Sequence, residues 1–135
     1  MLNLYYCLIQ PYITYALEVW YCASDYVRNI VCVLQKRCAR CIHNLPYNSH
    51  TRDFFSRSNI LPVDCLHKRN VLLYMYKTIN GHLEEELRNL LIRNRDIHSI
   101  STRNRNNFVL PRYNRSISQN CILFKGVELL SLIHI

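Results

Sequence analysis

Apolar side chains recur at three- and four-residue steps through the first two thirds of this chain, which is the spacing of amphipathic helices. The clearest stripe follows Ser24 and Asp25, either of which can cap the N-terminus of a helix. Its members are Val27, Ile30, Val31, Leu34, Cys38, Cys41 and Ile42. Off this stripe, or at its edge in the case of Arg37, lie Arg28, Lys36, Arg37 and Arg40. The pattern predicts a helix that buries its apolar stripe and turns these basic side chains outward.

Prolines mark the limits of the neighbouring elements. Residues 2–15 are largely apolar and predict a buried helix that Pro11 breaks or kinks. Pro46 lies in a break at residues 44–48, and a short helix is expected over residues 51–58.

A second long helix is predicted from Pro62 to about Asn80, with Gly81 at the position where glycine commonly ends a helix. A further short helix is expected over residues 83–92. We therefore predict a helical core over residues 2–92, because apolar stripes need a partner surface. The side chains expected to be buried together are Trp20, Ile30, Leu34, Cys38, Ile42, Leu66 and Leu73.

The character of the chain changes at Arg93. From there to Arg115, arginine and asparagine dominate and Asp96 is the single acidic residue. The sequence predicts an extended basic segment over residues 93–129, with candidate short β-strands at residues 108–110 and 122–124. The expected fold class is mainly α: an irregular small helical bundle over residues 1–92, followed by this segment. Two glycines in 135 residues also favour helices over a turn-rich sandwich.

Seventeen Lys and Arg against nine Asp and Glu give a formal charge of +8, which favours polyanionic partners such as nucleic acid. The candidate nucleic-acid-binding residues are Lys36, Arg37, Arg40, Lys68, Arg69, Arg93, Arg95, Arg103, Arg105, Arg112 and Arg115. Such residues can follow phosphates without reading bases, and Phe108 and Tyr113 can stack on unpaired bases. The alternative is a solvated face that keeps the protein in solution.

The sequence offers no catalytic pattern. Two glycines cannot form a nucleotide-binding glycine loop, and the scattered aspartates contain no pair placed to hold two metal ions. We therefore expect no enzymatic activity from this chain by itself.

Cysteine and histidine raise the question of a metal site. Cys38 and Cys41 with His43 suggest zinc, but no second ligand pair follows at a suitable spacing, and both cysteines fit the apolar stripe. We expect packing and no bound metal. Seven cysteines at irregular spacing indicate reduced thiols in an intracellular protein, nuclear or cytoplasmic. Polar residues interrupt the apolar run at residues 1–20, so no membrane association is expected.

A series of short motifs carries a family resemblance. In order they are Leu4-Tyr-x-x-Leu-Ile-x-Pro-Tyr-Ile-x-Tyr15, Glu18-Val-Trp20, Leu34-Gln-Lys-Arg37, Phe54-Phe55, Ile60-Leu61, Met75-Tyr-Lys77, Thr102-Arg103 and Lys125-Gly126-Val-Glu-Leu129. Together they resemble the region after the palm in reverse transcriptases of non-LTR retrotransposons, of the LINE-type, jockey-like branch. The similarity covers residues 2–129. Two positions depart from the family pattern: Tyr21 replaces a glycine, so the turn there is expected to differ, and Leu130 replaces a tryptophan.

The resemblance implies a thumb-like helical part of an RNA-directed DNA polymerase that grips the RNA template and the RNA–DNA duplex through phosphates. The family's paired catalytic aspartates and its endonuclease lie upstream of this region, so no catalytic residue is carried over. Mg²⁺ is expected only in the full-length enzyme, and the rest of the polymerase chain is an expected partner.

The last six residues, 130–135, can be encoded by the transposase mosaic-end adaptor used in sequencing libraries. We expect them to be an adaptor-derived artefact at the end of a fragment, and exclude them from fold reasoning. Two other functions stay open. One is a stand-alone basic helical module that binds acidic proteins, and the other is a membrane-associated peptide anchored by residues 2–20.

Overall fold

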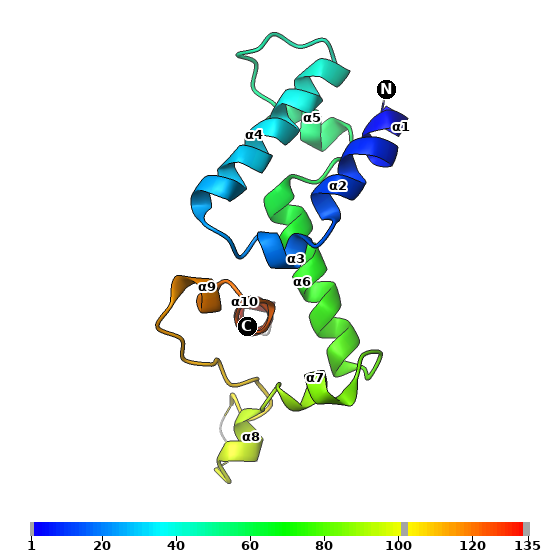
Figure 1. Ribbon diagram of the computed structural model, residues 1–135. Helices are drawn as coiled ribbons and strands as arrows, with labels where there is room; N and C mark the ends of the chain where they lie inside the picture. The colour runs from blue at the N-terminus through cyan, green and yellow to red at the C-terminus, as the bar shows by residue number, and fades with distance from the viewer. Residues whose placement is uncertain (1, 101–102, 134–135) are drawn as a thin grey trace. The chain divides into compact units, whose positions relative to one another are not determined.

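The computed structural model describes residues 2–100 and 103–133, and this part of the chain is mainly helical and forms no sheet (Figure 1). The predicted mainly α fold class is confirmed. The chain divides into two compact units, Met1–Lys68 (unit 1) and Arg69–Ile135 (unit 2). The division falls within helix α6 (Val63–Ile79), which contributes to both units. The segment boundary expected between residues 92 and 93 stays a prediction.

Unit 1 begins with a helix whose hydrogen-bonding pattern changes along its length. Its parts are α1 (Leu2–Leu4), the π-helix η1 (Tyr5–Ile9) and α2 (Gln10–Thr14). Pro11 has no N–H to donate, and its ring conflicts with the carbonyl four residues earlier, so the wider π turn stands just before it. The predicted helix with a break at Pro11 is thus confirmed. Its predicted burial is wrong, because Leu4, Leu8 and Tyr12 are more than half exposed.

Only one narrow stripe of this segment is buried. Tyr5, Ile13 and Leu17 are buried and Ile9 is partly buried, so core contacts recur at four-residue steps. Leu17 opens helix α3 (Leu17–Trp20). In a small bundle the surface helix has a partner on one side only, which leaves its other apolar side chains in solvent.

Helix α4 (Asp25–Ile42) has the predicted limits, with Ser24 at its N-cap, but it buries a different face from the predicted one. Gln35 and Ala39 are its buried residues. The predicted common burial is therefore wrong in most members. Of the seven, Leu66 is buried, Trp20, Cys38 and Ile42 are partly buried, and Ile30, Leu34 and Leu73 are exposed. The apolar stripe is wide, and α4 turns its Gln35 edge inward because that side chain has buried partners.

Gln35 joins three elements of unit 1. Its side-chain nitrogen donates to the Tyr5 hydroxyl at 2.8 Å and to the Leu61 carbonyl at 3.0 Å. Its side-chain oxygen accepts from the Val63 amide at 3.1 Å. A buried amide is tolerated when its donors and its acceptor are satisfied, as they are here. These three hydrogen bonds of Gln35, which we call the Gln35 hub, thus fix η1, α4 and the start of α6 relative to one another.

Helix α5 (Arg52–Arg57) and the limits of α6 confirm the predictions for residues 51–58 and 62–80. The first turns of α6 lie between α2 and α4 (Figure 1), and two apolar clusters fill unit 1. One contains Tyr5, Ala39, Phe54, Phe55 and Ile60. The other contains Ile13, Leu17, Val63 and Leu66.

Tyr21 ends α3 and ties it to α6. Its backbone is right-handed helical (φ −66°), so no glycine is required at this turn. Its hydroxyl donates to Asp64 Oδ1 at 2.9 Å, and its ring stacks on His67 with 3.8 Å between ring centroids. Burial, followed by the hydrogen bond to Asp64, raises the pKa of Tyr21 to about 12.

Unit 2 starts with the rest of α6, whose end confirms the role predicted for Gly81. Gly81 has φ +74°, and the His82 amide donates to the Lys77 carbonyl at 2.9 Å, as in a Schellman motif. The helix predicted over residues 83–92 is shorter and spans Glu85–Asn89 (α7). Beyond its end the Ile92 carbonyl accepts from the Val109 amide at 2.8 Å, a long-range bond that periodicity does not reveal.

The C-terminal part of unit 2 forms α9 (Ser116–Gln119) and α10 (Ile122–Ile133). The strand expected at residues 122–124 is therefore wrong. A short apolar run is ambiguous between strand and helix, and the described residues contain no strand that could pair with it. Val127 of α10 is buried, and Gly126 lets the helix backbone approach the Met75 side chain closely.

The basic segment is less extended than predicted. Helix α8 (Asn94–Ile97) interrupts it, and the other candidate strand, at residues 108–110, is reduced to an isolated antiparallel bridge between Arg93 and Phe108. Backbone bonds from Asn94 to Asn107 (3.0 Å) and from Arg95 to Arg105 (2.9 Å) hold the two sides of this loop together.

Candidate nucleic-acid interface

Three of the predicted basic residues line one hollow on unit 1. Lys36, Arg37 and Arg40 of α4 face the loop at residues 47–51 across a space of about 380 Å³, which we call the basic hollow. Their spacing along the helix brings them to one side of it. Val33, Tyr47, Asn48, Ser49, His50 and Thr51 complete the lining.

The loop of the basic hollow is built by the end of α4 and a tight turn. Asn44 adopts a left-handed conformation (φ +50°), and the Leu45 amide donates to the Arg40 carbonyl at 3.0 Å, which closes the helix. Both the amide and the hydroxyl of Ser49 then donate to the Pro46 carbonyl, at 3.0 and 2.7 Å. Tyr47 and Asn48 therefore occupy the two central positions of a turn.

Arg40 holds this loop against the helix. Its Nε donates to the Ser49 carbonyl at 3.1 Å, and its guanidinium carbon lies 5.8 Å from the centroid of the Tyr47 ring. Arg40 was expected to face outward, and its side chain is partly exposed at the edge of the hollow. Lys36 and Arg37 are exposed, as predicted. Arg40 thus positions the loop, while its two neighbours present charge to solvent.

The basic hollow carries an unbalanced positive charge. Among the described residues that line it, three are Lys or Arg and none is acidic. His50 adds an imidazole, and Asn48, Ser49 and Thr51 add polar groups that can bond to an anion's oxygens. This arrangement suits a phosphate, which a guanidinium can bind through two parallel hydrogen bonds.

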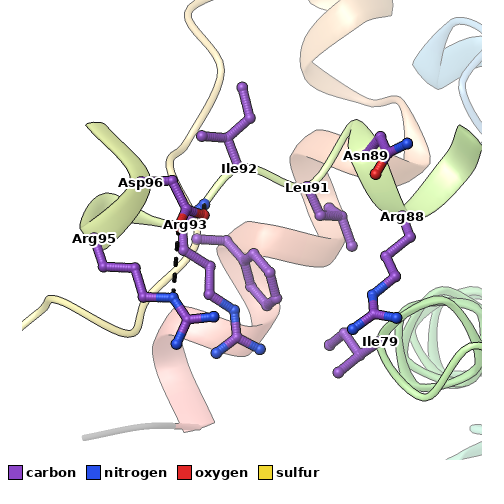
Figure 2. A pocket seen from close by; sticks show the side chains of 9 residues that line it. Ile79, Arg88, Asn89, Leu91, Ile92, Arg93, Arg95 and Asp96 are labelled. Atoms are coloured by element: carbon purple, nitrogen blue, oxygen red, sulfur yellow. Dashed lines mark hydrogen bonds and ion pairs between the residues drawn. The ribbon is translucent and has the colours of Figure 1, made fainter. Parts of the chain in front are cut away.

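A second basic pocket lies in unit 2 (Figure 2). It has a volume of about 300 Å³, and its lining includes Arg88, Arg93 and Arg95 together with the apolar side chains of Ile79 and Phe108. In Figure 2 the side chains of Arg93 and Arg95 extend in similar directions, and Arg88 lies on the opposite side of the pocket.

The geometry of this second pocket fixes two of its arginines. The Arg93 guanidinium lies over the Phe108 ring, 5.1 Å from its centroid, and Arg95 Nε is 3.6 Å from Asp96 Oδ1. Asp96 also accepts from the Arg93 amide at 3.2 Å. Three guanidinium groups against one carboxylate leave a surplus of two positive charges in the lining. Arg88 is not among the residues predicted from the sequence, because its place in this pocket depends on the fold of unit 2.

The remaining candidates are exposed and stand apart from these pockets. Lys68 and Arg69 lie on α6, where one ends unit 1 and the other begins unit 2. The other exposed candidates are Arg103, Arg105, Arg112 and Arg115.

The two aromatic residues expected to stack on bases each have a ring contact within unit 2. Phe108 contacts Arg93, and the Tyr113 ring lies 6.2 Å from that of Phe124. Tyr47 is an exposed aromatic residue that lines the basic hollow beside these cations, and the sequence did not lead us to predict it. Its signal was present, because Pro46-Tyr47-Asn48 is a turn sequence that follows a basic helix.

The candidate zinc ligands do not converge. Cys38 is half-buried, and its burial raises the pKa of its thiol. Cys41 is exposed. The His43 ring packs edge-on against the Phe54 ring, with 4.3 Å between the ring centroids. In residues 2–100 and 103–133 no three His, Cys, Asp or Glu side chains gather as a metal site would require.

None of the described helices combines the length and apolar character needed to cross a membrane. No protein-family model, no curated protein and no solved structure matches this chain.

Proposed function

We propose that this chain binds nucleic acid without sequence preference, as the thumb-like part of a retrotransposon reverse transcriptase. The observation that carries the proposal is the basic hollow, where Lys36, Arg37 and Arg40 line one space with no carboxylate among the lining residues described. The motif resemblance over residues 2–129 supports the polymerase family, and the formal charge of +8 agrees with a polyanionic partner.

In this proposal the chain holds a strand in position and performs no chemistry itself. Lys36 and Arg37 bind successive phosphates, and Arg40 keeps the facing loop in place through Ser49. Phosphate contacts fix the register of the strand but do not identify bases. Arg93 and Arg95 offer a second phosphate contact in unit 2. The catalytic aspartates and Mg²⁺ belong to the rest of the polymerase chain.

Binding measured over several sequences tests the proposal. The double variant Lys36→Gln/Arg37→Gln should weaken binding of an RNA–DNA duplex by a similar factor for every sequence, because only backbone contacts are lost. Arg40 is left intact, since its replacement would also release the loop. A matched control is Arg52→Gln/Arg57→Gln, which removes the same charge from exposed positions on α5 outside the hollow. A loss confined to one sequence would mean base readout and would contradict the proposal.

A second candidate function is a protein-interaction module, and one observation favours it. Tyr26, Ile30, Val33 and Leu34 of α4 are exposed and line an apolar hollow of about 340 Å³ that also includes Arg37. Exposed apolar surface of this kind often marks a protein contact. Binding to an acidic amphipathic peptide, without measurable binding to any oligonucleotide, would favour this candidate over the first.

A further inference from the structure

We infer that the basic hollow takes an unpaired nucleotide, whose base stacks on Tyr47 while its phosphate contacts Lys36 and Arg37. The inference rests on the proposed function and deepens it by naming the state of the bound strand. Tyr47 lines the basic hollow together with both cations. It also lines an adjoining hollow of about 570 Å³ with Arg37, Arg40 and Leu45, so the ring stands between two open spaces.

The Tyr47 ring is available to a ligand. The residue is 70% exposed, and its described ring contact is the Arg40 guanidinium at 5.8 Å. Exposed aromatic rings beside cations are typical of proteins that bind single strands, because every base has a face that can stack.

The turn that carries Tyr47 is also held in place before any strand binds. The turn that carries Tyr47 is closed by the two bonds from Ser49 to Pro46 and is fastened to α4 by Arg40. Thr51, at the other end of the loop, is buried. A ring fixed in this way loses little conformational entropy when a base stacks on it, which favours binding.

A duplex cannot use the same contact. Its bases are already stacked on one another, and their faces are closed to a side chain unless a nucleotide is flipped out at a cost of a few kcal/mol. A duplex can still bring its phosphates to Lys36 and Arg37. The ring therefore adds affinity for unpaired strands alone, whereas the cations serve both states.

Three ligands of equal length separate these contributions: a single-stranded oligonucleotide, a duplex, and an abasic strand that keeps the phosphates and lacks the bases. Binding of the full chain is followed by fluorescence anisotropy. Tyr47→Ala should weaken single-strand binding about five- to a hundred-fold, the range expected for loss of one stacked base. It should leave duplex and abasic binding within about two-fold, while Tyr47→Phe retains the single-strand affinity because the ring remains.

The matched control is Tyr12→Ala, since Tyr12 is an exposed tyrosine on α2 of the same unit and does not line either hollow. It should change none of the three affinities. Circular dichroism of each variant verifies that the fold is retained.

The outcomes distinguish this inference from the proposed function. Unchanged single-strand binding by Tyr47→Ala, or an equal loss on all three ligands, would overturn the stacking role while nucleic-acid binding stands. An equal loss would show that Tyr47 acts only by supporting the basic loop. Failure of the unaltered chain to bind any of the three ligands at low salt would overturn the proposed function itself.

Discussion

Replacing Gln35 with methionine tests whether the buried amide fixes unit 1. Methionine is close to glutamine in length but keeps none of the hydrogen bonds to Tyr5, Leu61 and Val63. Tyr5 and Val63 are fully buried (0% exposed), so the hydroxyl and the amide are left without partners. Each unsatisfied buried group costs roughly 1–3 kcal/mol. Leu61 is exposed, and we assign no further cost to its carbonyl.

The expected loss in the free energy of unfolding is about 2–4 kcal/mol, because burial of the apolar methionine offsets part of the cost. A domain the size of unit 1 has a total stability of roughly 3–10 kcal/mol, so the substitution should remove a large part of the free energy of unfolding. For such a domain each kcal/mol corresponds to a change in Tm of about 4–8 °C.

The assay is urea unfolding followed by tryptophan fluorescence. Trp20 is the single tryptophan of the chain and lies in unit 1, so its signal reports on that unit. Lys36→Met is the matched control, since it places the same residue at the neighbouring exposed position of α4, where lysine and methionine have similar helix propensity. A loss below about 1 kcal/mol in Gln35→Met, or an equal loss in the control, would refute the role given to the hub.

Two further predictions concern Tyr21 and Gly126. The pKa of Tyr21 is raised to about 12 from 10.0, so the fold favours the neutral phenol; its contribution to stability is intact below pH 10 and is lost as the pH rises from 10 to 12. Subtracting the tyrosinate absorbance titration of Tyr21→Phe from that of the unaltered chain should isolate this late step, and a midpoint near 10 would contradict the burial and the bond to Asp64. Gly126→Ala should lower the free energy of unfolding by about 1–2 kcal/mol, because the new methyl group would overlap Met75 Sδ and Cγ and this cost exceeds the gain in helix propensity. Urea unfolding followed by circular dichroism should show that Met75→Ala abolishes this penalty, whereas an equal penalty in both backgrounds would rule out the overlap.

The limits of the long helices could be predicted because residues typical of helix ends mark them in the sequence. Ser24 precedes α4, Pro62 precedes α6, and Gly81 closes α6 in the conformation that glycine favours. The buried face of α4 could not be predicted from periodicity, because it depends on Gln35 and on partners about thirty residues away on either side. The face of α4 that is buried here is the one that carries a polar residue, Gln35. A pattern of apolar positions cannot predict this.

The candidate site likewise contains features that the sequence predicts and features that it does not. Helical spacing alone predicts that Lys36, Arg37 and Arg40 lie close together, and they line one hollow. The position of Tyr47 depends on the turn after α4, and the pocket position of Arg88 depends on the long-range bridge between Arg93 and Phe108. Contacts made by turns and bridges are not visible in a stripe of residues.

The salt dependence of binding tests the central proposal most directly. The association constant of the full chain with a duplex is measured over a range of salt concentrations, and its logarithm is plotted against that of the salt. Lys36→Gln/Arg37→Gln should flatten the slope by about 0.9 for each lost phosphate contact, and hence by about 1.8, while Arg52→Gln/Arg57→Gln should leave it nearly unchanged. A slope that is the same in the first variant and in the unaltered chain would show that the basic hollow does not touch the phosphates.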